Sequence, residues 1–166
     1  MPDLLTHALV AYTVCTLLSW RYAWLTPPYV TAGMVGALLP DLVKVNLLVG
    51  APAVGEFLSL PFAWTPLHTL GGSFVSVGLG VVLVRHAERG RVAALLGLGA
   101  ATHLVADGFL QTPTGAVGAF LWPVWTQPIR LPGLYLSTDP RPTLVALLVA
   151  GVVAGLTRHR RGGDDL

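Results

Sequence analysis

The 166 residues are 54% hydrophobic and only 11% charged, and the mean hydropathy is +0.69. Because a soluble domain carries about a quarter charged residues, this composition excludes an ordinary soluble globular domain. The formal net charge is +2, and most of the arginines stand in short clusters, which indicates membrane topology rather than nucleic-acid binding. The single cysteine, Cys15, excludes an intrachain disulfide and is predicted to be a small buried residue.

The first two apolar runs lie in the N-terminal third of the chain. Leu4 to Trp20 lacks the basic residues that precede the hydrophobic core of a secretory signal, so we expect a retained helix. Tyr29 to Gly50 forms the second run and contains Pro40 with two charged residues close behind it. This pattern predicts that the second run is broken or re-entrant near Pro40.

Three further runs complete the predicted set. Leu67 to Val84 and Val92 to Leu110 flank an Arg-rich turn and are predicted to form an antiparallel hairpin. The last, Thr143 to Leu156, would span only about 21 Å at about 1.5 Å per residue. The intervening Gln111 to Arg141 is rich in Pro, Gly, Trp and Tyr, which is typical of a membrane-surface segment with interfacial aromatic residues.

The sequence therefore predicts an all-α fold, namely an integral membrane helical bundle of about five transmembrane helices with a Pro/Trp-rich interfacial segment. Residues 1–157 are predicted to form one transmembrane domain, and residues 158–166 a short basic-then-acidic cytoplasmic tail. The basic residues that share one predicted side are Arg21, Arg85, Arg89, Arg91, Arg158, Arg160 and Arg161. They predict a multi-pass protein of the cell (inner or plasma) membrane, with the N-terminus outside and the C-terminus cytoplasmic.

Five histidines and aspartates interrupt the apolar runs. They are His7, Asp41, His68, His103 and Asp107. A charged side chain at the bilayer centre costs about 2.5 to 3.5 kcal/mol on insertion scales, so each needs a partner or a function. Up-and-down threading of the helices places all five toward one face of the bundle, where we expect them to meet.

The chemistry of these residues suits a metal ion. His103 and Asp107 are four residues apart, so on a helix they share a face and can bind one ion. Neutral imidazole nitrogen and carboxylate oxygen favour zinc, with manganese or iron as alternatives, and a set without thiolate is more typical of catalytic than of structural sites. The sequence predicts a divalent ion bound by the five residues, with Asp41 or Asp107 as a catalytic base.

Each of the five residues also has a structural interpretation. Asp41 can cap the helix that follows it, and His7 can be an interfacial side chain. His68 stands at a helix start, where a lone histidine is more often structural. His103 and Asp107 can form a hydrogen bond between packed helices. Two other histidines, at positions 86 and 159, lie among arginines and are predicted to be solvated.

Several short motifs occur in a fixed order. They are Thr6-His7-Ala8-Leu9, Gly36-Ala37-Leu38-Leu39-Pro40-Asp41, Leu67-His68-Thr69 and Thr102-His103-Leu104-Val105-Ala106-Asp107, followed by Leu121-Trp122-Pro123 and Arg130-Leu131-Pro132. From His7 to about Pro132, their order and spacing resemble the YdjM-like family of membrane-bound metal-dependent hydrolases. The resemblance implies an all-helical membrane fold, a metal centre built from these histidines and aspartates, and hydrolysis of an unidentified substrate.

Two positions depart from the family pattern. Val43 stands where members usually carry a second acidic residue, and Ala63 stands where they usually carry an additional histidine. The residues that remain suit one ion rather than a two-metal centre.

Together these inferences predict a membrane-embedded metal-dependent hydrolase that acts on an ester or phosphoester. Its substrate would be amphiphilic, for example a membrane lipid, because the site lies near the interface. One alternative is an ion or proton transport protein with an intramembrane His/Asp site, and another is a site-degenerate membrane scaffold, which Val43 and Ala63 favour. No nucleic-acid partner is predicted, and the sequence does not fix the oligomeric state.

Overall fold

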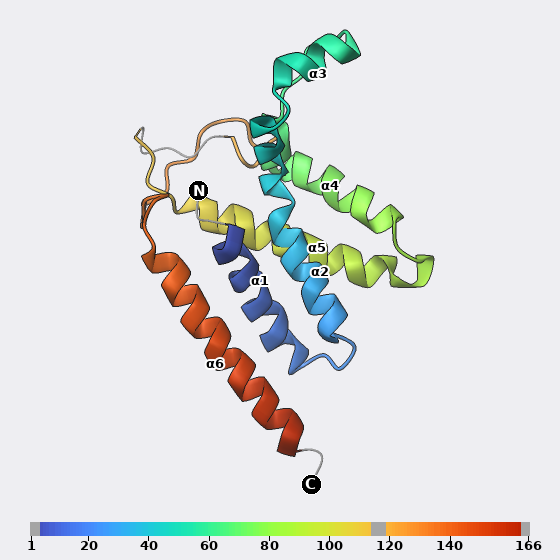
Figure 1. The fold of residues 1–166 in the computed structure, drawn as a ribbon, viewed down its shortest axis with the longest axis vertical. Coiled ribbons are helices and arrows are strands. Elements are labelled where there is room, and N and C mark those ends of the chain that lie inside the picture. Colours follow the sequence, from blue (N-terminus) through green and yellow to red (C-terminus); the bar gives the residue numbers. More distant parts are fainter. Residues whose placement is uncertain (1–3, 114–118, 164–166) are drawn as a thin grey trace.

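The computed structural model describes residues 4–113 and 119–163, which form a helical protein (Figure 1). The α-helices are α1 (Leu4–Ser19), α2 (Pro27–Leu38), α3 (Ala51–Leu58), α4 (Leu70–Val82), α5 (Arg89–Gly108) and α6 (Arg141–Gly163). Between them lie the 3₁₀ helices η1 (Pro40–Leu47), η2 (Thr65–His68) and η3 (His86–Glu88). The predicted all-α class is confirmed for the described residues.

The break that the sequence predicts near Pro40 is present. Helix α2 ends at Leu38, and η1 begins at Pro40 and is bent by 54° from the axis of α2. Proline has no backbone N–H and its ring clashes with the preceding turn, so an α-helix does not continue through it. The bend carries Asp41 into the interior of the protein, where it is buried.

Helices α2 and α5 pack backbone against backbone through glycines. A Cβ atom on Gly99 would lie 2.0 Å from the carbonyl oxygen of Gly33, and one on Gly36 would lie 2.2 Å from that of Leu96. Only glycine fits at such positions, and small residues of this kind allow close helix packing in membrane proteins. The close approach brings the end of α2 alongside the part of α5 that carries His103.

The remaining helices pack around this pair. Helices α4 and α5 are joined through η3 and lie side by side, as the predicted hairpin requires, and α6 packs along α1 (Figure 1). Trp20 Nε1 on α1 donates to Thr157 Oγ1 on α6 at 2.9 Å. Near the other end of the two helices, the hydroxyls of Thr6 and Thr143 are 2.7 Å apart.

The segment that follows α5 folds back over the ends of two helices. The amides of Leu70 and Gly71, at the start of α4, donate to the carbonyls of Phe120 and Trp122 at 2.7 and 2.8 Å. At the end of α5, the amide of residue 111 donates to the carbonyl of residue 135 at 2.8 Å. The predicted Gln111–Arg141 segment therefore covers one end of the bundle, although its residues 114–118 lie outside the described part.

Several element boundaries differ from those predicted. Residues 51–66, which lie between two of the predicted apolar runs, contain α3, which projects away from the other helices in Figure 1. Helix α4 begins at Leu70 rather than at residue 67, because residues 65–68 form η2 and Thr69 caps α4 by accepting from the Gly72 amide at 3.1 Å. Helix α6 continues through residues 158–163 of the predicted tail, and residues 164–166 lie outside the described part.

Much of the described surface is apolar, and several polar side chains are buried beside an apolar core. Large apolar side chains point outward, including Phe74 at 79% exposure and Leu79 at 66% on α4, whereas Ser73 and Ser76 of the same helix are buried. Extensive exposed apolar surface marks a face that meets lipid or another apolar partner. This arrangement agrees with the membrane class that the composition predicts.

One described helix is long and apolar enough to cross a bilayer, at residues 141–161, and the bent pair of α2 and η1 would be a second if it forms a single span. Helices α1 and α4 are apolar but shorter, with 16 and 13 residues, whereas about 20 are needed for a full crossing. Five transmembrane helices are therefore not confirmed, although the all-helical architecture is.

Candidate metal centre

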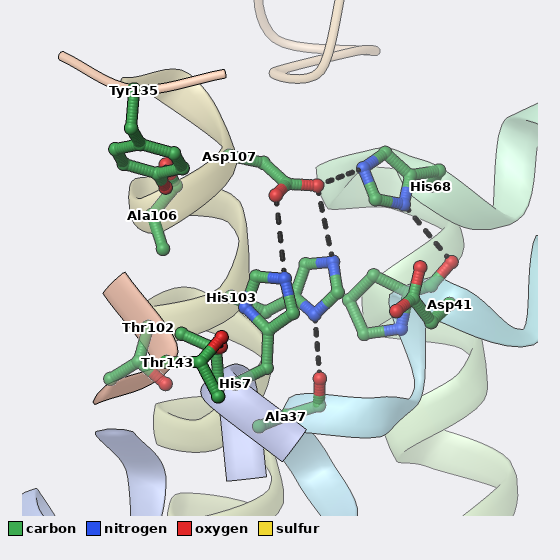
Figure 2. A network of polar contacts seen from close by, with 12 residues as sticks. His7, Ala37, Asp41, His68, Thr102, His103, Ala106, Asp107, Tyr135 and Thr143 are labelled. Carbon is green, nitrogen blue, oxygen red and sulfur yellow. Dashed lines mark hydrogen bonds and ion pairs between the residues drawn. The ribbon is translucent and has the colours of Figure 1, made fainter. Parts of the chain in front are cut away.

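The structure brings the five predicted site residues together from four elements (Figure 2). His7 lies on α1, Asp41 on η1, His68 on η2, and His103 and Asp107 on α5. We call these five residues the His/Asp cluster. Four of them are buried, with His7 at 1% and His103 at 0% exposure, and His68 is partly exposed. The predicted convergence of the five side chains is therefore present.

Three imidazoles surround the carboxylate of Asp107. Its Oδ2 lies 2.9 Å from His68 Nε2 and 3.4 Å from His103 Nε2, and its Oδ1 lies 3.4 Å from His7 Nε2. The rings of His7 and His103 are stacked, with centroids 3.7 Å apart. Side chains from three separate elements thus present a nitrogen atom to one carboxylate.

Backbone carbonyls orient two of the imidazoles. Nδ1 of His103 lies 2.6 Å from the carbonyl oxygen of Ala37, and Nδ1 of His68 lies 3.2 Å from that of Pro40. A carbonyl oxygen only accepts hydrogen bonds, so each Nδ1 must carry the hydrogen. In a neutral ring, Nε2 then has a free lone pair that faces Asp107, which is the usual arrangement of a metal-binding histidine.

Two lone pairs that face a carboxylate repel it, unless the rings are protonated or a cation lies between them. In the described part of the chain, several buried cluster atoms have no hydrogen-bond partner, namely both nitrogens of His7, Nε2 of His103, Oδ1 of Asp41 and both carboxylate oxygens of Asp107. Buried polar atoms without partners are costly and rare in native proteins. A divalent cation would bind several of these atoms at once, so the residues present fit such an ion.

The ligand atoms fall into two overlapping groups of three. They are His7, His103 and Asp107, and Asp41, His68 and His103, with the atoms of each group within 4.8 Å of one another. His103 belongs to both groups, and its Nδ1 is taken by the carbonyl of Ala37. Its Nε2 can bind only one ion, so the geometry favours one ion over two. This agrees with the sequence, in which Val43 and Ala63 stand at the positions of two further expected ligands.

Two contacts of the cluster were missed by the sequence reasoning. Lys44 Nζ donates to Asp41 Oδ2 at 2.7 Å, and the Tyr135 hydroxyl donates to the carbonyl oxygen of Ala106, the residue before Asp107. Burial, and then the negative charge of Asp107, raise the pKa of Tyr135 to about 12, so the hydroxyl remains a donor at neutral pH.

The ion pair between Lys44 and Asp41 bears on the alternative that Asp41 caps the helix that follows it. Asp41 makes no side-chain capping bond at the start of η1, and its carboxylate pairs with Lys44 instead. The i, i+3 spacing of the two residues was a signal for this pair. Tyr135 lies in the segment predicted to carry interfacial aromatic residues, and its contact has no comparable signal, because its partner Ala106 lies 29 residues away in the sequence.

A cavity of about 480 Å³ adjoins the cluster. Its lining residues are Ala63, Thr65, Pro66, His68, Thr69, Asp107, Ala119, Phe120 and Trp122. His68 and Asp107 are the cluster residues in this lining, and most of the others are apolar. Ala63, which stands where the family carries a histidine, also faces this cavity. By contrast, His86 and His159 are exposed, as predicted.

The fold and the cluster together define a class, a helical membrane protein with buried histidines and carboxylates that could hold a metal ion. The chain belongs to the YdjM inner membrane protein family, whose sequence model matches residues 1–164. Comparisons with curated proteins and with solved structures found no match. The predicted family and its membrane location are thereby confirmed.

Proposed function

We propose that this protein is a membrane-embedded, metal-dependent hydrolase that cleaves an ester or phosphoester of an amphiphilic substrate. The observation that carries the proposal is the set of buried ligand atoms without hydrogen-bond partners, gathered around Asp107 from separate helices. The side chains that would hold the ion belong to the His/Asp cluster, in which His7, His103 and Asp107 form one group of possible ligands and Asp41, His68 and His103 form the other. Zinc suits this set best, and manganese and iron are alternatives.

A bound divalent ion would polarise the ester and lower the pKa of a water molecule. The carbonyls of Ala37 and Pro40 would hold His103 and His68 in the tautomer with Nε2 free. Asp41 Oδ1 is buried and has no hydrogen-bond partner among the described residues, so it is suited to accept a proton from the attacking water. In this assignment Asp41 is the base and Asp107 is chiefly a ligand.

The cavity beside the cluster supports an amphiphilic substrate. Phe120, Trp122 and Pro66 offer it an apolar wall, while His68 and Asp107 lie where the polar group would react. Binding pockets of this kind combine apolar walls with a few polar groups that fix orientation. A membrane lipid meets these requirements, because its head group and apolar chain would contact the two parts of the cavity.

The decisive experiment is metal analysis of detergent-purified protein beside a His103→Ala variant. We expect about one divalent ion per chain in the wild type and loss of that ion in the variant. His86→Ala is the matched control, because His86 is exposed and lies outside the cluster, and it should retain the metal. A wild type without stoichiometric metal, or unchanged metal in His103→Ala, would refute the proposal.

Activity and flux assays separate the other two functions. Protein that binds metal but releases no product from a panel of lipid esters and phosphoesters would favour a site-degenerate scaffold. Metal or proton flux in sealed vesicles that His103→Ala abolishes would favour transport. Product release without flux supports the hydrolase.

The proposal includes the predicted topology, with about five membrane-embedded helices, the N-terminus outside and the C-terminus cytoplasmic. The basic residues Arg158 and Arg160 at the end of α6 support a cytoplasmic C-terminus. The cluster would then lie toward the outer side, near the start of α1 and the end of α5.

A further inference from the structure

A lysine ammonium group adjoins the His/Asp cluster. Lys44 Nζ lies 2.7 Å from Asp41 Oδ2, and the Lys44 side chain is 34% exposed whereas that of Asp41 is 1% exposed. In residues 4–113 and 119–163, no other lysine or arginine forms an ion pair with a cluster residue. The lysine therefore contributes the positive side-chain charge next to the cluster.

Lys44 makes the net charge of the proposed metal centre positive. A divalent ion would neutralise the carboxylates of Asp41 and Asp107, and neutral imidazoles would add no charge. The ammonium of Lys44 then leaves an excess of one positive charge. Fixed positive charge at a site with low-dielectric walls attracts anionic ligands and raises their local concentration.

The adjoining cavity is compatible with an anion that carries an apolar group. Asp107 is the only acidic residue in its described lining and belongs to the cluster itself, so no further carboxylate repels the ligand. The side chains of Phe120 and Trp122 provide apolar surface. A phosphate group fits the excess charge, and an apolar chain fits the wall of the cavity.

We propose that the ligand of this centre is a phosphate-bearing amphiphile, and that Lys44 provides the positive charge that selects it over neutral esters. This inference rests on the metal centre of the proposed function. It narrows the substrate class to phosphoesters and assigns a specificity role to a residue outside the ligand set. Lys44 is not among the residues that line the cavity, so it acts through its charge beside Asp41 rather than by lining the binding space.

Phosphate binding to the zinc-loaded protein tests the role of Lys44. Isothermal titration with inorganic phosphate would compare the wild type with Lys44→Met, Lys44→Gln and Lys44→Arg, each checked for metal content and helical circular dichroism. We expect phosphate affinity to fall about tenfold in the two neutral variants, because one close charge is lost, and to recover in Lys44→Arg. Metal content should stay the same, because Lys44 binds no metal.

Each outcome has a defined meaning. Equal phosphate affinity in the wild type and both neutral variants would overturn the inference. A phosphate affinity of Lys44→Arg as low as that of the neutral variants would also overturn it. Wild type that binds zinc but no phosphate would overturn it while leaving the metal centre intact. Wild type without metal would instead refute the proposed function.

A second titration distinguishes a lipid from free phosphate. Short-chain phosphatidic acid should bind the zinc-loaded wild type more tightly than inorganic phosphate, and short-chain diacylglycerol, which lacks the phosphate, should bind weakly. Comparable affinities for phosphatidic acid and inorganic phosphate would overturn the amphiphile assignment. Comparable affinities for phosphatidic acid and diacylglycerol would overturn the role of charge.

Discussion

Asp107 is the residue at which three elements of the fold meet. Its carboxylate lies within 3.4 Å of imidazole nitrogens from α1, η2 and α5, and the residue is only 5% exposed. A carboxylate so far from water needs compensating charge. The local chemistry of the proposed centre therefore depends on this side chain more than on any single histidine.

Replacement of Asp107 by Asn should abolish tight metal binding. The amide preserves the shape of the side chain but removes the negative charge and one ligand oxygen. Zinc affinity should therefore fall by more than about a hundredfold, which exceeds the usual effect of replacing a residue that only hydrogen-bonds to a metal ligand. Competition with a chromophoric chelator measures this change. Asp139→Asn is the control, because Asp139 pairs with Arg141 outside the cluster, and equal losses in both variants would contradict the assignment.

Tyr135→Phe should weaken the fold locally without removing a ligand. The hydroxyl donates to the carbonyl of Ala106, which also accepts from the Phe109 amide, so its loss removes one of two hydrogen bonds to that oxygen and should cost about 1 kcal/mol of unfolding free energy. Thermal unfolding in detergent measures this cost. Tyr22→Phe, at a side chain that is 46% exposed, should leave stability unchanged. A zinc affinity in Tyr135→Phe as low as that of Asp107→Asn would contradict a supporting role.

The cluster residues could be predicted because each is a polar exception in an apolar stretch. The position of His103 and Asp107 on one helical face follows from their spacing alone. The Tyr135 contact could not be predicted, because it depends on where a long irregular segment folds back. The carbonyl of Ala37, which orients His103, is a backbone group and leaves no signal in side-chain chemistry.

At the scale of elements, the contact between α2 and α5 determines the position of His103. Gly99 lies one helical turn before His103 and against the backbone of α2. Any side chain there must separate the two helices. The same separation would move His103 away from the carbonyl of Ala37, so packing and site geometry are coupled.

Two substitutions on α5 test this coupling. Gly99→Ala should lower the unfolding temperature and the zinc affinity, because its Cβ would lie 2.0 Å from the Gly33 carbonyl oxygen. Gly97→Ala is the matched control, since no described atom lies within 4 Å of the position of its Cβ. The control should be neutral or stabilising by up to about 1 kcal/mol, because alanine favours helix more than glycine does. Similar melting temperatures for the two variants would contradict the packing described here.

Element boundaries could be predicted where backbone chemistry decides them and not elsewhere. Pro40 predicted the break between α2 and η1 because proline cannot continue a helix. The start of α4 was placed too early, because hydropathy does not distinguish a 3₁₀ turn from the first turn of an α-helix. Helix α3 was missed, since its eight residues are too few for a clear periodic pattern.

At the scale of the whole molecule, the structure combines an apolar exterior with an interior that holds a polar cluster beside an apolar core. The sequence predicted a membrane protein from composition, but the number of crossings depends on helix lengths that hydropathy alone did not fix. Segments such as α1 and α4 are apolar yet shorter than a bilayer requires. They could reach across only where the bilayer thins, where flanking side chains extend to the interface, or where oligomerisation accommodates the mismatch.

Cysteine labelling in intact cells tests the predicted orientation. The native Cys15 is fully buried, so it should contribute little background. Ser137→Cys, at an exposed position in the segment predicted outside, should react with a membrane-impermeant maleimide. His159→Cys, near the C-terminal end of α6, should react only after the cells are permeabilised. If only His159→Cys were labelled in intact cells, the predicted orientation would be wrong and the opposite one would be indicated.

Helix α6 carries none of the five cluster residues, yet among the unbroken helices of residues 4–113 and 119–163 it alone has the length and hydropathy for a crossing. It packs on α1 through the small buried side chains Ala146, Ala150 and Val153. The described helix that could span a membrane and the helices that carry the cluster residues are therefore different parts of the chain. We consequently expect residues 141–163 to tolerate wide exchange among apolar side chains on their outer surface. Substitutions in α5 are restricted both where it packs against α2 and where it carries cluster residues.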